Sequence, residues 1–333
     1  MNRLLFWFRS FGLCVALGVA CLFLFLFVGV PHVYPKTYGI SWSMDYATYL
    51  GIDSNAGLTA ALTELGVRHV RIPTYWTHLE RVAGVFDWSA IDRQLDIIET
   101  HQGTVTLVVG AKQPRWPECW FPDWAKALDA TKRREAQLGY VRRTIERYKD
   151  RSVITRWQVE NEPTFFGAFG DCALYDASLI NEEIALITSV DLTHRRIVTT
   201  ASGELSTWMF EPKGIDTGFS IYRVVLNPLF SRWSYWFFPS WFYGRKIALH
   251  TLLRGGRMYV SEFQMEPWVE HDLKTASFED QFKTFDSKQL QDNLLFATRL
   301  PVPEIHFWGA EWWYWMKTQK GHPEFWDAMK QVF

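Results

Sequence analysis

Two stretches of the sequence place acidic side chains directly after apolar, strand-like runs. Glu160 and Glu162 follow Val153–Val159, and Glu262 follows Met258–Ser261. Two carboxyl groups that face each other across a cleft can cleave a glycosidic bond. One is protonated and donates to the departing oxygen, while the other is ionised and attacks the anomeric carbon. Because neighbouring carboxylates raise each other's proton affinity, their surroundings must decide which of them holds the proton.

Eight strand-like runs alternate with amphipathic stretches along the chain. The runs are Tyr38–Ser43, His69–Ile72, Thr104–Val109, Val153–Val159, Ile197–Ala201, Gly218–Tyr222, Met258–Ser261 and Glu304–Trp308. Apolar residues recur at helical spacing between most of them, as at Leu138, Val141 and Ile145. Strands that alternate with helices predict a parallel sheet, and eight units predict a closed (β/α)8 TIM barrel. Leu205–Gly214, after the fifth run, has the weakest helical pattern.

The barrel predicts where the chemistry takes place. In such barrels the reactive groups lie where the strands end and the following loops begin. The fourth and seventh strands lie on opposite sides of an eight-stranded ring, so we expect Glu162 and Glu262 to face each other across the mouth. A retaining reaction needs the two groups about 5–5.5 Å apart. We expect a structural role for Glu160, and Glu266 is the local alternative to Glu262.

The two acidic stretches also resemble a known family. W-Q-V-E-N-E-P at 157–163 and Y-V-S-E-F at 259–263 are similar to the fourth- and seventh-strand signatures of the clan A glycoside hydrolases, which are retaining (β/α)8-barrel enzymes of the cellulase and xylosidase type. The resemblance covers nearly all of the chain after the amino-terminal apolar run. It implies that Glu162 is the acid/base and that Glu262 is the nucleophile.

Four further residues match positions of the clan, and the resemblance implies that they bind substrate. Arg71 closes the second strand near the nucleophile, Tyr222 ends the sixth strand beside it, and Asn161 would bond the 2-hydroxyl of the sugar. Trp308 ends the eighth strand, where a tryptophan commonly forms the floor of the sugar subsite. Arg71 could instead pair with an acid inside the barrel, and Trp308 could belong to the core. Gly110–Pro117 lacks the histidine that several member families carry, which leaves the sugar open.

The composition narrows the function classes further. The formal net charge is −1 and the pI is near 6.8, so no global field favours nucleic acid as a partner. The nine histidines are scattered and the four cysteines form no CxxC pair, so we expect neither a metal nor another cofactor. Cys119 follows the third strand and Cys172 the fourth. Both therefore belong to neighbouring loops, where an oxidising compartment would allow a disulfide.

The amino terminus carries the pattern of a membrane anchor. Phe11–Val30 is a run of 20 residues without a charge. At about 1.5 Å per residue it matches a hydrocarbon core of about 30 Å. Arg3 and Arg9 precede it, which predicts a cytoplasmic amino terminus and an extracytoplasmic domain. We therefore expect a single-pass anchor in the cell membrane over residues 1–34 and the catalytic domain over 35–333, with a cleaved signal peptide as the alternative.

The densest aromatic segment of the chain is 229–243, which follows the sixth strand. It is too short and too aromatic for an ordinary barrel helix, which leaves two interpretations. One is a loop packed over the cleft wall. The other is a second membrane contact, because Trp and Tyr favour the interface and Arg232, Arg245 and Lys246 could meet headgroups.

The favoured function is a retaining glycosidase that acts on a β-linked oligo- or polysaccharide outside the cytosol. A membrane-tethered transglycosylase is the nearest alternative, because it uses the same two carboxyl groups with a sugar in place of water. A carbohydrate-binding barrel without turnover and a structural envelope protein are further alternatives. The loops of a barrel, rather than its strands, select the sugar, the linkage and the acceptor.

Overall fold

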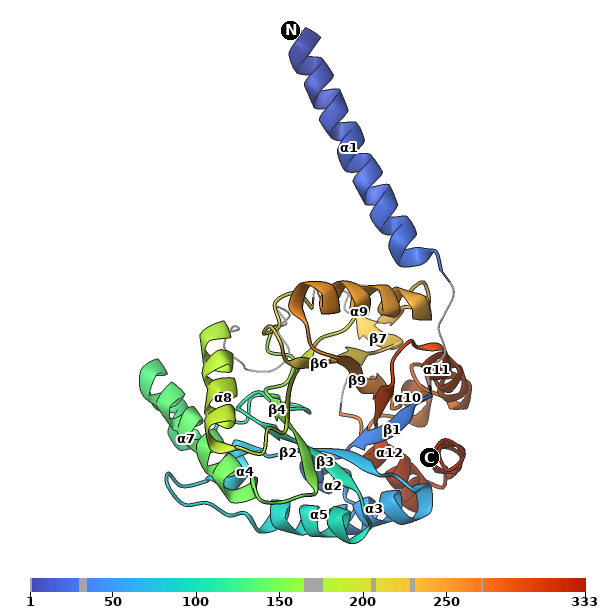
Figure 1. Cartoon of the computed structure of the whole chain (residues 1–333). Helices are drawn as coiled ribbons and strands as arrows, with labels where there is room; N and C mark the ends of the chain where they lie inside the picture. The colour runs from blue at the N-terminus through green and yellow to red at the C-terminus, as the bar shows by residue number, and fades with distance from the viewer. Residues whose placement is uncertain (1, 30–34, 165–175, 205–207, 228–230, 271) are drawn as a thin grey trace.

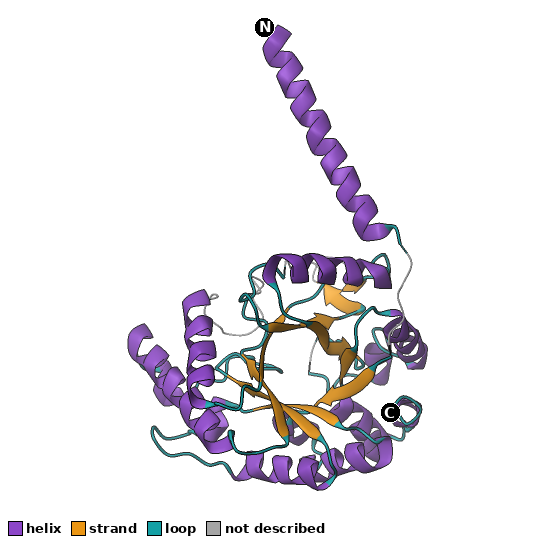
Figure 2. Ribbon diagram, viewed as in Figure 1, coloured by secondary structure: helices purple, strands orange, loops and turns teal. Residues whose placement is uncertain are grey.

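All eight predicted strands are present in the computed structural model, which describes residues 2–29, 35–164, 176–204, 208–227, 231–270 and 272–333. The barrel strands are β1 (Thr37–Ser41), β2 (His69–Pro73), β3 (Thr104–Val109), β4 (Ile154–Val159), β5 (Arg196–Ala201), β6 (Asp216–Ile221), β9 (Met258–Gln264) and β10 (Glu304–Trp308). They pair in parallel in the order β1-β10-β9-β6-β5-β4-β3-β2, and β2 pairs again with β1 to close the ring (Figure 2). The (β/α)8 barrel is confirmed.

Helices surround the ring and connect successive strands (Figure 1). After the amino-terminal α1 (Asn2–Phe27), the α-helices are α2 (Met44–Leu50), α3 (Ser54–Ala60), α4 (Trp76–Leu79), α5 (Ser89–Thr100), α6 (Asp123–Lys126), α7 (Ala130–Tyr148), α8 (Ala177–Val190), α9 (Ser240–Arg254), α10 (Phe278–Phe282), α11 (Ser287–Arg299), α12 (Ala310–Trp315) and α13 (Glu324–Met329). The π-helical turns η1 (Ala61–Leu65) and η2 (Met316–Lys320) extend α3 and α12. Several helices begin at an aspartate that accepts from their first N–H groups, as Asp129 does at α7.

The connections after β5 and β6 depart from the regular repeat. Residues 208–214 form turns rather than a helix, and 205–207 lie outside the described residues. After β6, β7 (Val224–Asn227) and β8 (Ser231–Ser234) form an antiparallel hairpin that leads to α9. The described part of 229–243 contains β8 and the first turn of α9, so the interpretation of this segment as a loop was wrong there, and the second membrane contact remains a prediction.

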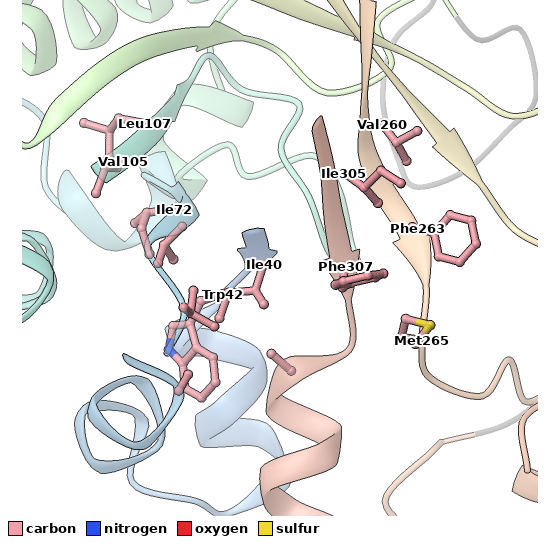
Figure 3. Close-up of a cluster of buried hydrophobic side chains, with 14 of the residues drawn as sticks. Ile40, Trp42, Ile72, Val105, Leu107, Val260, Phe263, Met265, Ile305 and Phe307 are labelled. Atoms are coloured by element: carbon pink, nitrogen blue, oxygen red, sulfur yellow. The ribbon is translucent and has the colours of Figure 1, made fainter. Parts of the chain in front are cut away.

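Alternation along the strands separates two environments. Val105 and Leu107 of β3 pack in the apolar core (Figure 3), whereas the side chain of Thr106 between them points to the other face of the sheet. Ion pairs lie within the barrel towards its amino-terminal end, where Arg156 donates to Glu304 through Nη1 at 2.8 Å and Nη2 at 2.9 Å. The apolar shell between strands and helices holds the ring, and polar pairs fill its interior.

Helix α1 rises away from the barrel and is continuous from Asn2 to Phe27 (Figure 1). Its large apolar side chains are exposed, with Phe11 at 70% and Val19 at 63% of their free surface. Within the part of the chain whose side chains are described, no helix combines the length and apolarity needed to cross a bilayer. The membrane anchor remains a prediction.

Candidate active site

Glu262 lies at the mouth of the barrel, held by hydrogen bonds to both of its oxygens. β9 runs on to Gln264, so Glu262 belongs to the strand rather than to the loop after it. Its register with β6 shifts between Phe219 and Ser220, which is a local irregularity of the ladder. Arg71 Nη1 donates to Oε1 at 2.6 Å, and the Tyr222 hydroxyl donates to Oε2 at 2.8 Å. These donors orient the carboxylate and stabilise its negative charge.

Glu162 lies three residues beyond the end of β4 and has an unusual backbone conformation. Its φ of +46° is in the left-handed region, which residues other than glycine seldom adopt. Its N–H donates to Thr200 Oγ1 at 2.7 Å, and the Ser220 hydroxyl donates to its carboxyl group. Burial, followed by the negative charge of Glu262, raises the pKa of Glu162 to about 7. A substantial share of the Glu162 carboxyl groups is therefore protonated at neutral pH.

Tyr222 lies close to both carboxyl groups, which places the two glutamates at the same mouth of the barrel. Burial raises the pKa of its hydroxyl most, and the charges of Glu262 and then Glu162 raise it further. Tyr222 follows β6 directly, between the strands that carry the two glutamates in the ring order. The structure thus brings Glu162, Glu262 and Tyr222 together at the carboxyl ends of three strands, as the sequence predicts.

Arg71 is fully buried and connects strands across the mouth. Besides its bond to Glu262, its Nε donates to Gln158 Oε1 at 2.7 Å and its Nη2 donates to Asn161 Oδ1 at 2.6 Å. Asn161 Oδ1 also accepts from Thr200 Oγ1 at 3.2 Å. The two interpretations of Arg71 coincide, because the acid that it pairs with inside the barrel is Glu262.

Trp308 borders the mouth, but an arginine that the sequence did not single out covers one face of its ring. The Arg115 guanidinium carbon lies 3.9 Å from the Trp308 ring centroid and 3.7 Å from that of Tyr46. Arg115 also pairs with Glu266 and, through Nη2 at 2.8 Å, with Glu311. Glu266, the alternative nucleophile, is therefore held in an ion pair by the arginine that stacks on Trp308.

The open space at this side of the mouth is small. A pocket of about 170 Å³ lies here. It is lined by Ser41, Trp42, Ser43, Arg71, Pro73, Pro114, Arg115, Trp308 and Glu311. A larger pocket of about 960 Å³ lies near the amino-terminal ends of β5 and β6, with Asp191, His194 and Arg257 in its wall. The barrel chemistry belongs at the carboxyl ends, so we place the candidate site at the mouth around Glu162 and Glu262, which the smaller pocket adjoins through Arg71.

Glu160 organises the loop after β3. It accepts hydrogen bonds from Ala111 N at 3.0 Å, Lys112 N at 2.5 Å and Gln137 Nε2 at 2.7 Å. A glycine is needed at position 110, because the φ of Gly110 is +103° and a Cβ on this residue would lie 2.4 Å from Glu160 Oε1. Glu160 thus has structural contacts, in line with its expected role.

Sequence reasoning missed Ser220 and Arg115. Ser220 carried a usable signal, because it lies two residues before Tyr222 within the predicted strand Gly218–Tyr222, where alternate side chains face the same side. Arg115 carried no such signal, because the course of a loop decides where its side chain lies.

Cys119 is disulfide-bonded, whereas Cys172 lies outside the described residues, so their pairing remains a prediction. Within the described ranges, no group of three His, Cys, Asp or Glu side chains is placed to hold a metal ion.

Comparison with known proteins supports the fold. No family model matches the chain, and no curated protein matches its sequence. Among solved structures, endo-glycoceramidase II from Rhodococcus sp. is similar over 84% of this chain and 75% of its own, with a TM-score of 0.53 and 12% identity. The chain has the fold of barrel glycosidases. A GH10 endoxylanase from a sugarcane soil metagenome is similar over 82% of this chain and 86% of its own, with a TM-score of 0.53 and 12% identity.

A beta-galactosidase from the psychrophilic Marinomonas ef1 is also similar, with a TM-score of 0.52 and 13% identity. The match covers 82% of this chain but only 54% of the beta-galactosidase chain. The resemblance to clan A glycosidases is therefore confirmed at the level of the barrel fold. Function in such a fold has to be argued from the site itself.

Proposed function

We propose that the chain is a retaining glycoside hydrolase with Glu162 as acid/base and Glu262 as nucleophile. One observation carries the proposal, which is the different surroundings of the two carboxyl groups. Arg71 and Tyr222 donate to both oxygens of Glu262, whereas burial and the charge of Glu262 raise the pKa of Glu162 to about 7. One group is stabilised as an anion and the other holds a proton, as a double displacement requires.

In the first step, Glu162 donates its proton to the glycosidic oxygen and a Glu262 oxygen bonds to the anomeric carbon. The bond from that carbon to the leaving oxygen breaks, and the leaving group departs as an alcohol. In the second step, the Glu162 carboxylate takes a proton from water, the water oxygen bonds to the anomeric carbon, and the bond to Glu262 breaks. Two displacements at opposite faces retain the anomeric configuration.

The neighbouring side chains bind and orient the sugar. Asn161 Oδ1 is occupied by Arg71 and Thr200, which leaves its Nδ2 as the donor to the 2-hydroxyl. Trp308 lines the small pocket together with Arg71, which bonds Glu262, so we place the reacting sugar beside these side chains at the mouth. The similarity to an endoxylanase and to a beta-galactosidase supports a saccharide as substrate, and the name of the beta-galactosidase supports β-linked sugars.

A panel of 2-fluoroglycosides with activated leaving groups tests this proposal. We expect one matching sugar to form a stable adduct on the peptide that carries Glu262, read by mass spectrometry, and the Glu262→Gln variant to form none. An adduct on Glu266 would overturn the assignment of the nucleophile. No adduct with any sugar, together with glycan binding, would favour the barrel without turnover.

Product analysis separates hydrolysis from transfer. We expect the anomeric configuration to be retained in the first product that NMR detects. Glycosyl transfer to an added sugar in preference to water would identify a transglycosylase, which uses the same two glutamates.

We also propose that residues 11–30 anchor the chain in the cell membrane, with the barrel on the extracytoplasmic side. The uncharged run and the preceding Arg3 and Arg9 support this orientation, as does the continuity of α1 over Asn2–Phe27. We expect the full chain to stay with membranes in alkaline carbonate, and protease added outside the cell to reach the barrel. Release into the soluble fraction would contradict the anchor.

A further inference from the structure

Helix α9 has a buried and an exposed face of different composition. The buried face packs on the barrel through Phe242, Tyr243 and His250. Trp241, Arg245, Ala248 and Leu252 follow one another at spacings of four, three and four residues, which places them along one side of the helix. Arg245 and Ala248 are exposed, and Leu252 shows 80% of its free surface. The outer face of α9 is therefore apolar with one central cation.

Further apolar side chains lie at both ends of the same helix. Trp236 and Phe237, in the turn before α9, show 78% and 37% of their free surface. Leu253, in its last turn, shows 55%. Exposed apolar residues that gather on one face mark an interaction surface, whereas single ones need no explanation. We call this set, with the outer face of α9, the α9 surface.

The charged residues of the segment that contains α9 all have one sign. Residues 217–257 contain no aspartate or glutamate, although the whole chain has a net charge of −1. The cations of the segment are Arg223, Arg232, Arg245, Lys246, Arg254 and Arg257. Of these, Arg232, Arg245 and Arg257 are exposed, one before the helix, one within it and one after it. The apolar face is thus accompanied by cations along its whole length.

The α9 surface lies at the foot of α1. The ring of Phe27, the last residue of α1, lies 5.3 Å from that of Phe242 and 6.1 Å from that of Phe238. The Arg245 guanidinium carbon is 5.0 Å from the Phe25 ring. Figure 1 shows α9 on the side of the barrel from which α1 rises. A bilayer crossed by α1 would therefore begin directly beside α9.

We propose that the α9 surface lies on the outer leaflet of the membrane that α1 crosses, with its apolar side chains at the acyl boundary and its arginines against anionic headgroups. An apolar helix face with flanking cations is what such an interface binds. This inference rests on the proposed membrane anchor and adds a second contact, which fixes how the barrel is oriented. A second copy of the chain is the other candidate, but a symmetric self-contact of this surface would bring its exposed arginines together with no acid from residues 217–257 to pair them.

Site-directed spin labels on the full chain test the proposal. Cys14 and Cys21 are first changed to serine, because they are the free cysteines among the described residues. A single label then replaces Leu252. The matched control is Arg93, an exposed residue of α5, the helix on the opposite side of the barrel (Figure 1). Each variant is reconstituted into vesicles of phosphatidylcholine alone and into vesicles with about a third of phosphatidylglycerol.

We expect the label at Leu252→Cys to collide several-fold more with oxygen than with a water-soluble nickel chelate, most strongly with the anionic lipid. The label at Arg93→Cys should favour the chelate in both lipids. A Leu252→Cys label that matches the control would overturn the proposal. Protection from both reagents would also overturn it, since it would indicate burial against protein.

A third label separates this inference from the proposals on which it rests. A label at Val19→Cys reports whether α1 lies in the bilayer. If it is in lipid while the label at position 252 is in water, the anchor stands and the α9 contact fails. If it is in water, both fail. Labelling of Glu262 by the fluoroglycoside reports the glycosidase chemistry independently of all three positions.

Discussion

Arg71 and Glu262 form a buried ion pair across the barrel mouth, with Nη1 2.6 Å from Oε1 and side-chain exposures of 0% and 5%. The pair joins β2 to β9, two strands that are not neighbours in the ring. Removing one partner of such a pair leaves an uncompensated buried charge, which costs about 3–5 kcal/mol. The same ion pair therefore stabilises the fold and orients the proposed nucleophile.

The first prediction concerns Arg71→Met. We expect it to lower the free energy of unfolding by about 3–5 kcal/mol and to abolish turnover, because Glu262 keeps a charge without its partner. The double variant Arg71→Met with Glu262→Gln should recover most of the stability and none of the activity. Denaturant unfolding in detergent measures the first effect, and fluoroglycoside labelling the second. Equal instability of the single and double variants would contradict this explanation.

Tyr222→Phe should have a smaller and more specific effect. It removes one hydrogen bond to a charged group, worth about 1.5–3 kcal/mol, which corresponds to a loss of about 10- to 150-fold in kcat. The ring remains, so packing against Trp268 at 5.3 Å should persist and the fold should be unchanged. Steady-state kinetics with thermal unfolding as a control checks this. An unchanged kcat would show that the hydroxyl does not act on the nucleophile.

The pH dependence of kcat/KM should report the proton on Glu162. Its pKa is raised to about 7 in the free protein, and it must be protonated to donate to the leaving group. We therefore expect kcat/KM to fall as the pH rises through about 7, and to depend little on pH for substrates whose leaving groups need no proton. If kcat/KM fell in the same way at alkaline pH for both kinds of substrate, this result would contradict the role of Glu162 as the acid.

Arg115→Met should destabilise the chain in a pH-dependent manner. Burial raises the pKa of Glu266, and Arg115 opposes that rise, so the variant should raise the Glu266 pKa further. A carboxyl group with a raised folded-state pKa binds more protons folded than unfolded, so stability is lost as the pH rises. We expect a larger loss near pH 8 than near pH 5 in denaturant unfolding. Arg142→Ala, at an exposed pair with Glu146, serves as the control and should cost at most about 0.5 kcal/mol.

The disulfide prediction can be checked by mass. Alkylation of the unfolded, non-reduced chain should modify Cys14 and Cys21 only, and reduction should release two more thiols. A peptide that joins Cys119 to Cys172 in a non-reducing digest would identify the pair. Modification of Cys172 without reduction would contradict it.

The strands and the two glutamates could be predicted from the sequence, because both depend on local pattern. Apolar runs of strand length that alternate with helical spacing identify a barrel, and a barrel directs the residues at its strand ends to one mouth. Glu162 and Glu262 follow from that rule. Arg71 was named on resemblance, and only the structure shows its bonds to Glu262, Gln158 and Asn161.

Tertiary structure alone decided the features that depend on the path of the loops and on packing between distant segments. The sequence gives no sign that Arg115 would stack on Trp308 and hold Glu266, because a loop residue has no periodic neighbour that fixes its direction. The turns at 208–214, where the sequence pattern predicts a weak helix, and the helix that begins at Ser240, where it predicts none, likewise depend on the tertiary structure. Local pattern fixes which side of a strand a residue faces, whereas burial and charge from distant segments fix what that residue can do there.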